Sequence, residues 1–403
     1  MNLIKCYLSR LSFFLLIVLI SCEQVMEDSE LTIIKPLNLC SPLNIDISEI
    51  VDSISYIPLE TTKKSILRHA QKVVFADSCL FVYDGIELKS FNYNGEFISE
   101  IGCRGNGPAE YINIDAFFID ELNDNVGIVC GVTNKIRYYD YNGVYQYSTS
   151  FSDIKDANVI NQLEVMPDGD LLAHYCLPSY AFPIEAQYKI LHVNKKGEID
   201  ADNLLDVSKL NTKESGIHPY MYHSMAEYGG HLGLFPMSDK IWLYDSGDMV
   251  PKYRVITNHE IADKKFVKKN WTGSVPEFIT KALDGNKSPG LLRVHSTEDY
   301  LFVADSYHET IIWDGIDAIT LGNVSHMDLN IGGGVLVSGL SDNCLGTYNP
   351  AFLLNSKDKI SDDRLLSIID NLEYESNPIV YRYHFKKNLI DILKKKLQRN
   401  NEI

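Results

Sequence analysis

A polar turn containing glycine recurs along the chain and constrains the fold more than any other sequence feature. In each copy an apolar segment runs into the turn and another apolar segment follows it. Two copies, at residues 91–97 and 139–145, contain Asn-Gly, a pair typical of β-hairpins whose two central residues both need positive φ. Weaker copies lie at residues 193–199, 243–249 and 313–316. Their glycines are 48 to 68 residues apart, which predicts the multi-stranded blades of a β-propeller.

Each unit also begins in the same way, with two apolar segments separated by a polar turn. Residues 72–76 and 80–83, for example, flank such a turn and read as the first and second strands of a blade. Five units follow one another from about residue 70 to residue 325. A sixth is expected to start near His326, with residues 335–340 as its second strand.

A ring of blades needs closure, because otherwise its last blade leaves an open strand edge. Residues 54–59 form a strand-like segment before the first blade, so we expect them to complete blade six. Residues 361–372 have helical spacing with Ser361 as N-cap, and residues 379–385 return to a strand pattern. The predicted fold is all-β: a six-bladed β-propeller of four-stranded blades, with a short helical insertion and a C-terminal helix.

The N-terminus has the pattern of a secretory signal. Lys5 and Arg10 are followed by an apolar run over residues 11–20, which is too short to span a bilayer. The sequence LISC at residues 19–22 resembles the bacterial lipobox, in which the cysteine carries the lipid. Cys22 is therefore the predicted lipidation site, and an acylated cysteine would anchor the chain to a membrane.

These patterns divide the chain into four parts. We predict a lipoprotein signal peptide over residues 1–21, a lipidated acidic tether over 22–44, the propeller over 45–387 and a basic helical tail over 388–403. The tail is expected to cap the propeller rather than to bind a membrane. The predicted location is the cell envelope, lipid-anchored to the outer membrane, on either its periplasmic or its outward-facing side.

Charge and cysteine content exclude several classes of function. The chain has 37 basic and 54 acidic residues, so it lacks the basic surface that nucleic-acid binding needs. Its cysteines contain no Cys-x-x-Cys pair, which leaves a zinc site without support. Cys130 and Cys176 lie in apolar runs, and we expect free buried thiols there. No metal or other cofactor is predicted.

Two segments resemble the bacterial six-bladed β-propeller lipoproteins. Residues 47–62 are similar to the opening of that family, and residues 101–111 to its Gly-x-x-Gly-x-Gly-Pro-x-Glu-Tyr loop. The resemblance covers about residues 45–387 and extends in outline to propellers with NHL and TolB-type blades, which mostly bind other molecules. Cys103 and Ala109 depart from the family's loop. The resemblance therefore implies a binding propeller and does not name the ligand.

The links between blades predict where a ligand would bind. Each link from an outer strand to the next inner strand lies on one face, around the mouth of the central channel. Aromatic and arginine side chains there can stack on sugar rings or hold carboxylates, whereas His223 and His326 could instead hold a metal with a carboxylate. The candidate ligand-binding residues in or beside these links are Arg68, Arg104, Glu110, Tyr111, Tyr222, His223, Trp271, Arg293 and His326.

The glycine-rich loop at residues 102–111 has two interpretations. It could cradle a phosphate, but no helix follows it to supply the usual N-terminal site. Alternatively its glycines form a tight turn, Glu110 pairs with Arg104, and Tyr111 packs between blades. We favour the second interpretation.

Three classes of function remain open. The leading one is a ligand-binding propeller of the envelope, with a glycan or glycopeptide held at the channel mouth; a peptide is a further candidate ligand. The second is a protein–protein interaction scaffold for an outer-membrane complex. The third is a propeller lyase or hydrolase, although no nucleophile-elbow, metalloprotease or Walker motif is present and no catalytic residue is predicted.

Overall fold

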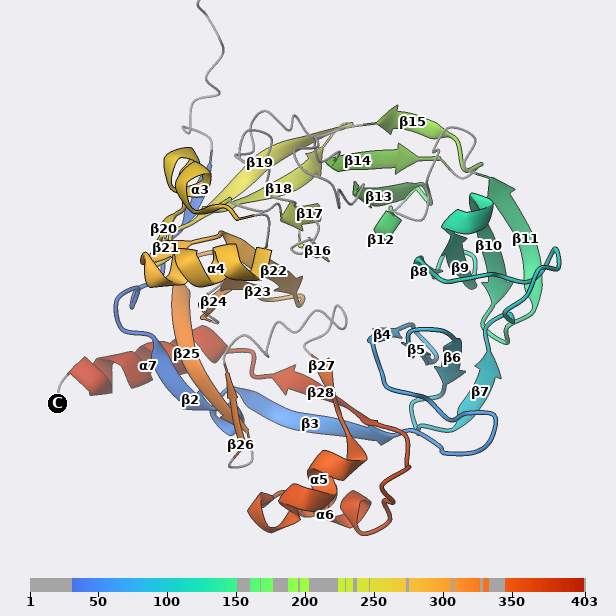
Figure 1. The fold of residues 1–403 in the computed structure, drawn as a ribbon. Coiled ribbons are helices and arrows are strands. Elements are labelled where there is room, and N and C mark those ends of the chain that lie inside the picture. Colours follow the sequence, from blue (N-terminus) through green and yellow to red (C-terminus); the bar gives the residue numbers. More distant parts are fainter. Residues whose placement is uncertain are drawn as a thin grey trace, which may run out of the picture. The chain divides into compact units, whose positions relative to one another are not determined.

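The computed structural model describes residues 31–150, 160–166, 168–176, 188–194, 196–202, 224–228, 230–234, 238–245, 247–272, 275–305, 307, 309–326, 329–332 and 345–401. Contacts divide the chain into residues 1–32 and 33–403, and the second unit forms the propeller. Its sheets follow one another around a ring as six blades, which confirms the predicted fold (Figure 1).

Blades 1 to 3 are four-stranded antiparallel sheets in chain order, with the first strand innermost (Figure 1). Blade 1 comprises β4 (Lys72–Phe75), β5 (Leu80–Tyr83), β6 (Leu88–Phe91) and β7 (Phe97–Glu100). Blade 2 comprises β8 (Ala116–Asp120), β9 (Asn125–Cys130), β10 (Lys135–Asp140) and β11 (Tyr145–Ser150), with the short helix η3 (Gly131–Thr133). Blade 3 comprises β12 (Ile160–Val165), β13 (Leu171–Cys176), β14 (Tyr188–Val193) and β15 (Ile199–Asp202).

Blades 4 to 6 take strands from both ends of the propeller sequence. Blade 4 comprises β16 (Ser224–Glu227), β17 (His231–Leu234), β18 (Lys240–Asp245) and β19 (Asp248–Val255), with β1 (Thr32–Ile34) beside β19. Blade 5 comprises β22 (Leu291–Ser296), β23 (Leu301–Asp305), β24 (Thr310–Trp313) and β25 (Ala318–His326), with β2 (Leu43–Asp46) and β26 (Leu329–Gly332) both paired to β25. The described strands of blade 6 are β27 (Leu345–Tyr348), β28 (Ile379–Phe385) and β3 (Val51–Pro58).

Residues 33–58, which we call the N-terminal belt, close the ring. The belt passes along the outer strands of blades 4 and 5 and then becomes the outer strand of blade 6. There β3 pairs antiparallel with β28, from Ile379 opposite Pro58 to Phe385 opposite Val51. This confirms the predicted closure by an N-terminal strand. The strand predicted at residues 335–340 lies outside the described residues.

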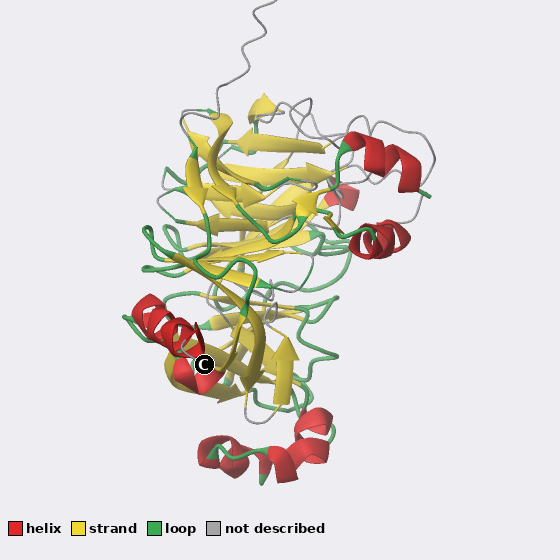
Figure 2. Ribbon diagram, turned by 90° about the vertical axis from the view of Figure 1, so that its left-hand side faces the viewer, coloured by secondary structure: helices red, strands yellow, loops and turns green. Residues whose placement is uncertain are grey.

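Short helices decorate the links and the C-terminus (Figure 2). The link from blade 4 to blade 5 holds α3 (Lys264–Asn270) and α4 (Val275–Asp284), between the short paired strands β20 (Glu260–Ile261) and β21 (Lys287–Ser288). Between β27 and β28 lie α5 (Pro350–Ser356), η8 (Lys357–Lys359) and α6 (Asp363–Ile369). The belt contains η2 (Ile47–Glu49), and the described chain ends in α7 (Leu389–Asn401).

Two helix predictions can be compared with these elements. The predicted insertion helix is present as α6, but Ser361 is not its N-cap: Asp362 accepts backbone N–H bonds from Arg364 and Leu365 instead. The tail helix α7 packs its apolar side on blades 5 and 6, and Lys396 binds Glu49 of η2 at 2.7 Å. Within the described residues, no helix is long and apolar enough to cross a bilayer.

The core lies in layers between neighbouring blades. One cluster joins Ile57 and Val380 of blade 6 to Val73 and Leu80 of blade 1, and another joins blades 1 and 2 around Phe81. Burial of these side chains fixes each blade against the next, which sets the positions of the links on the faces of the ring.

The recurring glycine turns are hairpins, but not of the predicted type. The glycine takes a positive φ in every copy, +86° at Gly95 and +80° at Gly143, whereas Asn94 and Asn142 do not. The first residue of the turn explains the difference. The Asn92 side chain accepts backbone N–H bonds at 2.9 and 3.0 Å, so only the glycine needs the left-handed region.

The cysteines follow the predicted pattern in part. Cys79 and Cys130 are free and buried, as expected for thiols in apolar strands. Cys40 and Cys103, for which no burial was predicted, are free and exposed, and the side chain of Cys176 lies outside the described residues.

Candidate functional site

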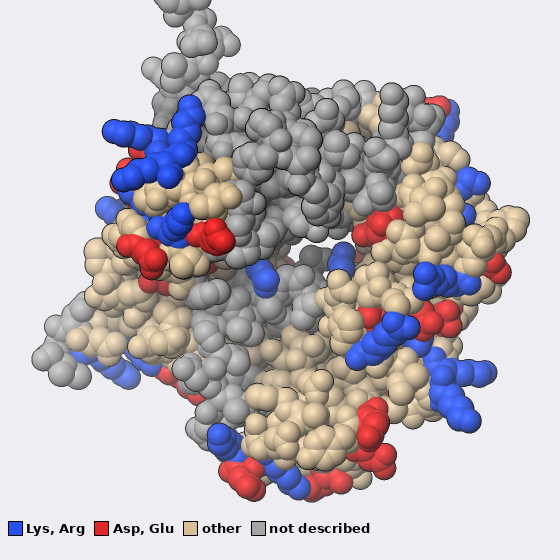
Figure 3. Space-filling view, in the orientation of Figure 1, with Lys and Arg blue, Asp and Glu red and all other residues tan. Residues whose placement is uncertain are grey.

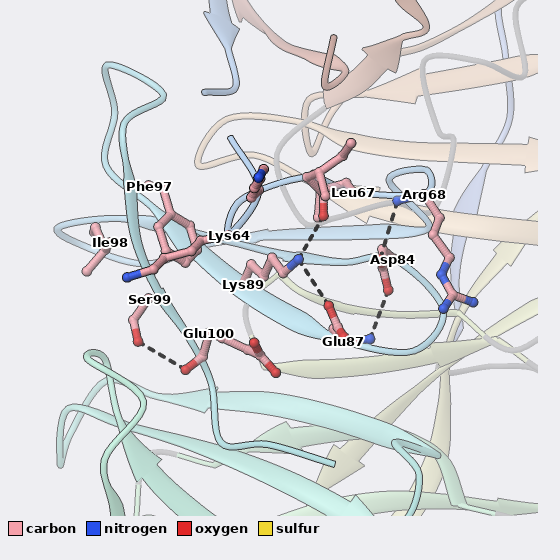
Figure 4. A pocket seen from close by; sticks show the side chains of 12 residues that line it. Lys64, Leu67, Arg68, Asp84, Glu87, Lys89, Phe97, Ile98, Ser99 and Glu100 are labelled. Carbon is pink, nitrogen blue, oxygen red and sulfur yellow. Dashed lines mark hydrogen bonds and ion pairs between the residues drawn. The ribbon is translucent and has the colours of Figure 1, made fainter. Parts of the chain in front are cut away.

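The described residues form an open cavity of about 950 Å³ on blade 1 (Figure 4). Its walls come from the link between β3 and β4, from the turn between β5 and β6, and from the outer strand β7. We call it the blade-1 groove; its lining residues are Lys63, Lys64, Ile66, Leu67, Arg68, Asp84, Glu87, Lys89, Phe97, Ile98, Ser99 and Glu100.

A buried lysine lies at the floor of the groove. Lys89 belongs to β6, a strand whose four residues are all buried, and it is only 3% exposed. Its Nζ donates a hydrogen bond to the Ile66 carbonyl at 2.7 Å and pairs with Glu87 at 3.0 Å (Figure 4). A buried ammonium group is tolerated only with such partners. Lys89 therefore ties the link to the sheet beneath it.

Three carboxylates surround this lysine and make the floor of the groove acidic. Asp84 accepts backbone N–H bonds from Ile86 at 3.0 Å and Glu87 at 2.8 Å, which fixes the β5–β6 turn. Glu100 lies opposite Lys89 in the β6–β7 register. Burial and repulsion from Glu87 raise the pKa of Glu100, while Lys89 acts in the opposite direction.

The rim of the groove is basic and apolar. Lys63, Lys64 and Arg68 are exposed along the link. Ile66 and Ile98 are 48% and 39% exposed on either side of the groove. Acidic and basic side chains accordingly lie next to one another over blade 1 (Figure 3). From the rim to the floor, the lining of the groove therefore changes from positively charged to apolar and then to negatively charged side chains.

Asn377, which precedes β28 and is 2% exposed, fixes the position of the β3–β4 link along the groove. Its side-chain amide donates to the carbonyls of Glu60 at 2.6 Å and Ser65 at 2.9 Å. Its side-chain oxygen accepts the backbone N–H of Leu67 at 2.8 Å. A residue of blade 6 therefore fixes the position of the β3–β4 link, which forms one side of the groove.

The structure places two predicted site residues where a ligand can reach them. Arg68 is exposed in the blade-1 groove, and Arg293 is exposed on the inner strand β22 of blade 5. Tyr222 and His223 lie outside the described residues.

The glycine-rich loop after β7 encloses one of its own side chains. Arg104 donates from Nε to the Ile112 carbonyl at 3.0 Å, whereas Glu110 accepts the backbone N–H of Gly107 at 2.8 Å. A Cβ at Gly105 would lie 2.0 Å from the Glu110 carboxylate. The predicted Glu110–Arg104 pair is therefore wrong, because the loop wraps around Glu110. The Glu110 carboxylate, rather than an external anion, accepts the Gly107 N–H.

Three further site predictions need correction. Tyr111 is fully buried between blades 1 and 2, which confirms this part of the favoured interpretation of the loop and removes Tyr111 from the candidate ligand-binding residues. Trp271 belongs to the small core of α3 and α4, with its ring 5.9 Å from that of Phe278. His326 ends the outer strand β25 instead of starting an inner strand, because β25 is extended to nine residues by pairing with β2 and β26.

The metal alternative rested on His223 and His326, and the position of His326 in an outer strand removes its geometric basis. Among the residues that the structure describes, no three His, Cys, Asp or Glu side chains lie close enough to hold a metal ion.

Two neighbouring carboxylates, Asp305 and Glu309, lie in the β23–β24 turn of blade 5. Asp305 is 2% exposed and accepts the backbone N–H groups of Tyr307 at 2.9 Å and Glu309 at 3.1 Å. Burial, and secondarily repulsion from Asp305, raise the pKa of Glu309 to about 7.

This raised pKa predicts a pH-dependent stability effect. The folded protein holds the Glu309 proton more tightly than the unfolded chain, so stability is lost as pH rises from about 4.5 to about 7. Glu309→Gln is expected to leave the free energy of unfolding unchanged at pH 4, below the unfolded pKa, and to raise it by about 1 kcal/mol at pH 8.5, after allowance for solvent screening. Denaturant unfolding at the two pH values measures this; an equal effect at both would contradict it.

Two residues of the groove were not predicted from the sequence: Lys89 at its floor, and Asn377, which fixes the β3–β4 link. Lys89 carried a usable signal, since a lysine within an otherwise apolar strand segment is either exposed or paired. Asn377 carried none, because its partners are about 310 residues away in the sequence.

Solved structures support the fold. A protein of Bacteroides fragilis described as a candidate exported protein has a TM-score of 0.62 at 16% identity, over 88% of this chain and 100% of the other. A member of the DUF4221 family from Bacteroides vulgatus has a TM-score of 0.44 at 10% identity, over 83% and 97%. The WD40 domain of Pan2 from Neurospora crassa has 0.36 at 9%, over 62% and 64%. Only the first likeness is strong enough to indicate a shared fold.

No curated protein matches the sequence. A family model described as a domain of unknown function, DUF4934, matches residues 32–384, which include the belt and the described strands of all six blades. The chain therefore belongs to the DUF4934 family.

Proposed function

We propose that this protein is a lipid-anchored binding protein of the bacterial outer membrane and that the blade-1 groove holds a segment of a partner polypeptide. The signal pattern and Cys22 support the location, as does the name of the Bacteroides fragilis relative. The observation that carries the binding proposal is the arrangement of the groove: an acidic floor around Lys89 beneath exposed Ile66, Ile98 and a basic rim.

A polypeptide fits this arrangement better than a glycan does. An extended peptide can supply a basic side chain to Glu87 and Glu100, apolar side chains to the walls, and acidic groups to the rim. A sugar ring would need an exposed flat aromatic. The one aromatic residue lining the groove, Phe97, packs edge-on against Phe91 at 5.8 Å and is partly buried.

Peptide selection on the purified protein tests the proposal. We expect selected peptides to combine a Lys or Arg with an acidic residue. Lys63→Glu together with Lys64→Glu should weaken their binding about tenfold, because both lysines lie on the rim. The matched control, Lys265→Glu with Lys268→Glu, reverses two exposed lysines on α3 and should leave affinity unchanged. Equal losses in both variants would show that general charge, not the groove, attracts the peptide.

One observation favours a glycan as second candidate. Tyr374 and Phe352, beside α5 and α6, are 60% and 48% exposed, and the Tyr374 hydroxyl donates to the Asn355 side chain at 3.2 Å. An exposed aromatic next to an amide is a suitable surface for a sugar. A glycan panel measured beside the peptides distinguishes the two: glycan binding lost in Tyr374→Ala, with no peptide binding, would replace the polypeptide proposal.

A further inference from the structure

The outer rim of blades 4 and 5 carries exposed apolar side chains where the described chain begins. On the belt, Ile34 and Pro36 point inward and are buried, whereas Ile33, Lys35 and Leu37 are exposed. This alternation is that of an extended segment with one face on the sheet. Ile33 is 50% exposed and Leu37 is 55% exposed.

A third apolar side chain lies beside them. The backbone N–H of Leu37 donates to the Ala318 carbonyl at 2.9 Å, and Pro36 forms a bridge with Ala318. Ile316 lies two residues before Ala318, in the β24–β25 turn, and is 87% exposed, more than any other large hydrophobic residue of the described chain. We call Ile33, Lys35, Leu37 and Ile316 the rim patch.

Charged side chains of both signs flank the rim patch, because Asp314 and Asp391 lie near Lys394. Lys35 separates its two belt residues, and Lys394 of α7 pairs with Asp317, next to Ile316. On the same helix Lys395 and Arg399 are exposed and four residues apart, so they share one face. Single exposed hydrophobic residues are ordinary on protein surfaces, but three together beside lysines are typical of a surface that meets a lipid interface.

The position of the rim patch in the chain selects its partner. Ile33 is eleven positions after Cys22, and even a fully extended chain covers only about 40 Å over that distance. A lipid on Cys22 would therefore hold this edge of the propeller close to a bilayer. Apolar side chains could enter the headgroup region there, and lysines could reach the anionic groups.

We propose that the rim patch is a second, non-covalent contact between the propeller and the bilayer, and that its apolar side chains dock in the phospholipid headgroup region. The assignment of a bilayer as partner rests on the proposed lipid anchor at Cys22. Docking here would hold the propeller by its rim at blades 4 and 5.

Vesicle flotation of the mature full chain carrying Cys22→Ser tests the contact without the anchor. The vesicles contain phosphatidylethanolamine and phosphatidylglycerol. We expect Leu37→Glu with Ile316→Glu to lower the vesicle-bound fraction about tenfold, because two apolar side chains become charged. The matched control is Leu122→Glu with Val132→Glu, at residues 63% and 62% exposed on blade 2, and should float like the parent.

Three results would overturn the proposal: no flotation of the parent chain, equal flotation of the two double variants, or a dimer in solution that Leu37→Glu and Ile316→Glu abolish. The last would make the rim patch a contact between copies of this chain. Fatty-acid labelling of the wild-type chain in cells tests the anchor separately. Absence of label would refute lipidation at Cys22 while leaving the flotation result to stand.

Discussion

Replacing Gly143 by alanine is expected to lower the free energy of unfolding by roughly 3–4 kcal/mol. Gly143 has φ +80°, a conformation that costs an L-residue about 1–2 kcal/mol. In addition, a Cβ there would lie 2.1 Å from the backbone carbonyl oxygen of Glu100 at the end of β7. The hairpin of blade 2 thus packs its glycine directly on the outer strand of blade 1, where a side chain has no room.

Gly247 provides the matched control in blade 4. Its φ is +89°, but nothing lies within 4 Å of the position that a Cβ would take. Gly247→Ala should therefore lose only the conformational part, about 1–2 kcal/mol. Denaturant unfolding of both variants separates the two contributions. Equal losses would mean that the contact between blades 1 and 2 contributes nothing.

Asn377→Ala is expected to lower the free energy of unfolding by roughly 3 kcal/mol and to weaken peptide binding in the blade-1 groove at least fivefold. The substitution removes three hydrogen bonds, a part-buried one to Glu60 and two buried ones to Ser65 and Leu67, and leaves their backbone groups without these partners. These bonds fix the β3–β4 link along the groove, so we expect that link to become displaced in the variant.

Asn38→Ala is the control that distinguishes an effect on peptide binding from an effect on stability. Asn38 is also buried, at 5% exposure, and makes three comparable bonds: its amide donates to Thr320 and Ser41, and its oxygen accepts the Thr320 N–H. Asn38 lies in the belt at blade 5, outside the groove. Asn38→Ala should destabilise the protein similarly and leave peptide affinity unchanged. A parallel loss of affinity in both variants would mean that binding only reports global stability.

The architecture was predictable because its signals are local. The turns at Gly95 and Gly143 identify hairpins within a few residues, and their spacing gives the blades. The closing strand was predictable because a ring needs one and residues 54–59 were the strand-like segment available before blade 1. Its observed extent, Val51–Pro58, differs by a few residues because pairing with β28 begins earlier.

The candidate site was predicted much less well, since it depends on contacts between distant segments. Arg68 was identified because it lies in a link, and links meet on one face. Tyr111 lies in a link too, yet its ring packs between blades, and nothing local distinguishes the two cases. His326 was misplaced because the partners β2 and β26 extend β25, and pairing of this kind is invisible in one strand's sequence.

The acidic floor of the groove could not be predicted from the sequence for the same reason. Asp84, Glu87 and Glu100 come from a turn and a neighbouring strand, and only the register of β6 with β7 brings Glu100 opposite Lys89. An error of one residue in that register would turn Glu100 to the other face of the blade.

Amide hydrogen exchange of the full mature protein, with and without a peptide selected on it, tests the central claim most directly. If the blade-1 groove is the binding site, the peptide should slow exchange in residues 63–68 and 97–100 and leave the link at Arg104 and the strand β22 at Arg293 unchanged. Protection around Arg104 and Arg293, with none in the groove, would contradict the account and move the site to the mouth of the channel.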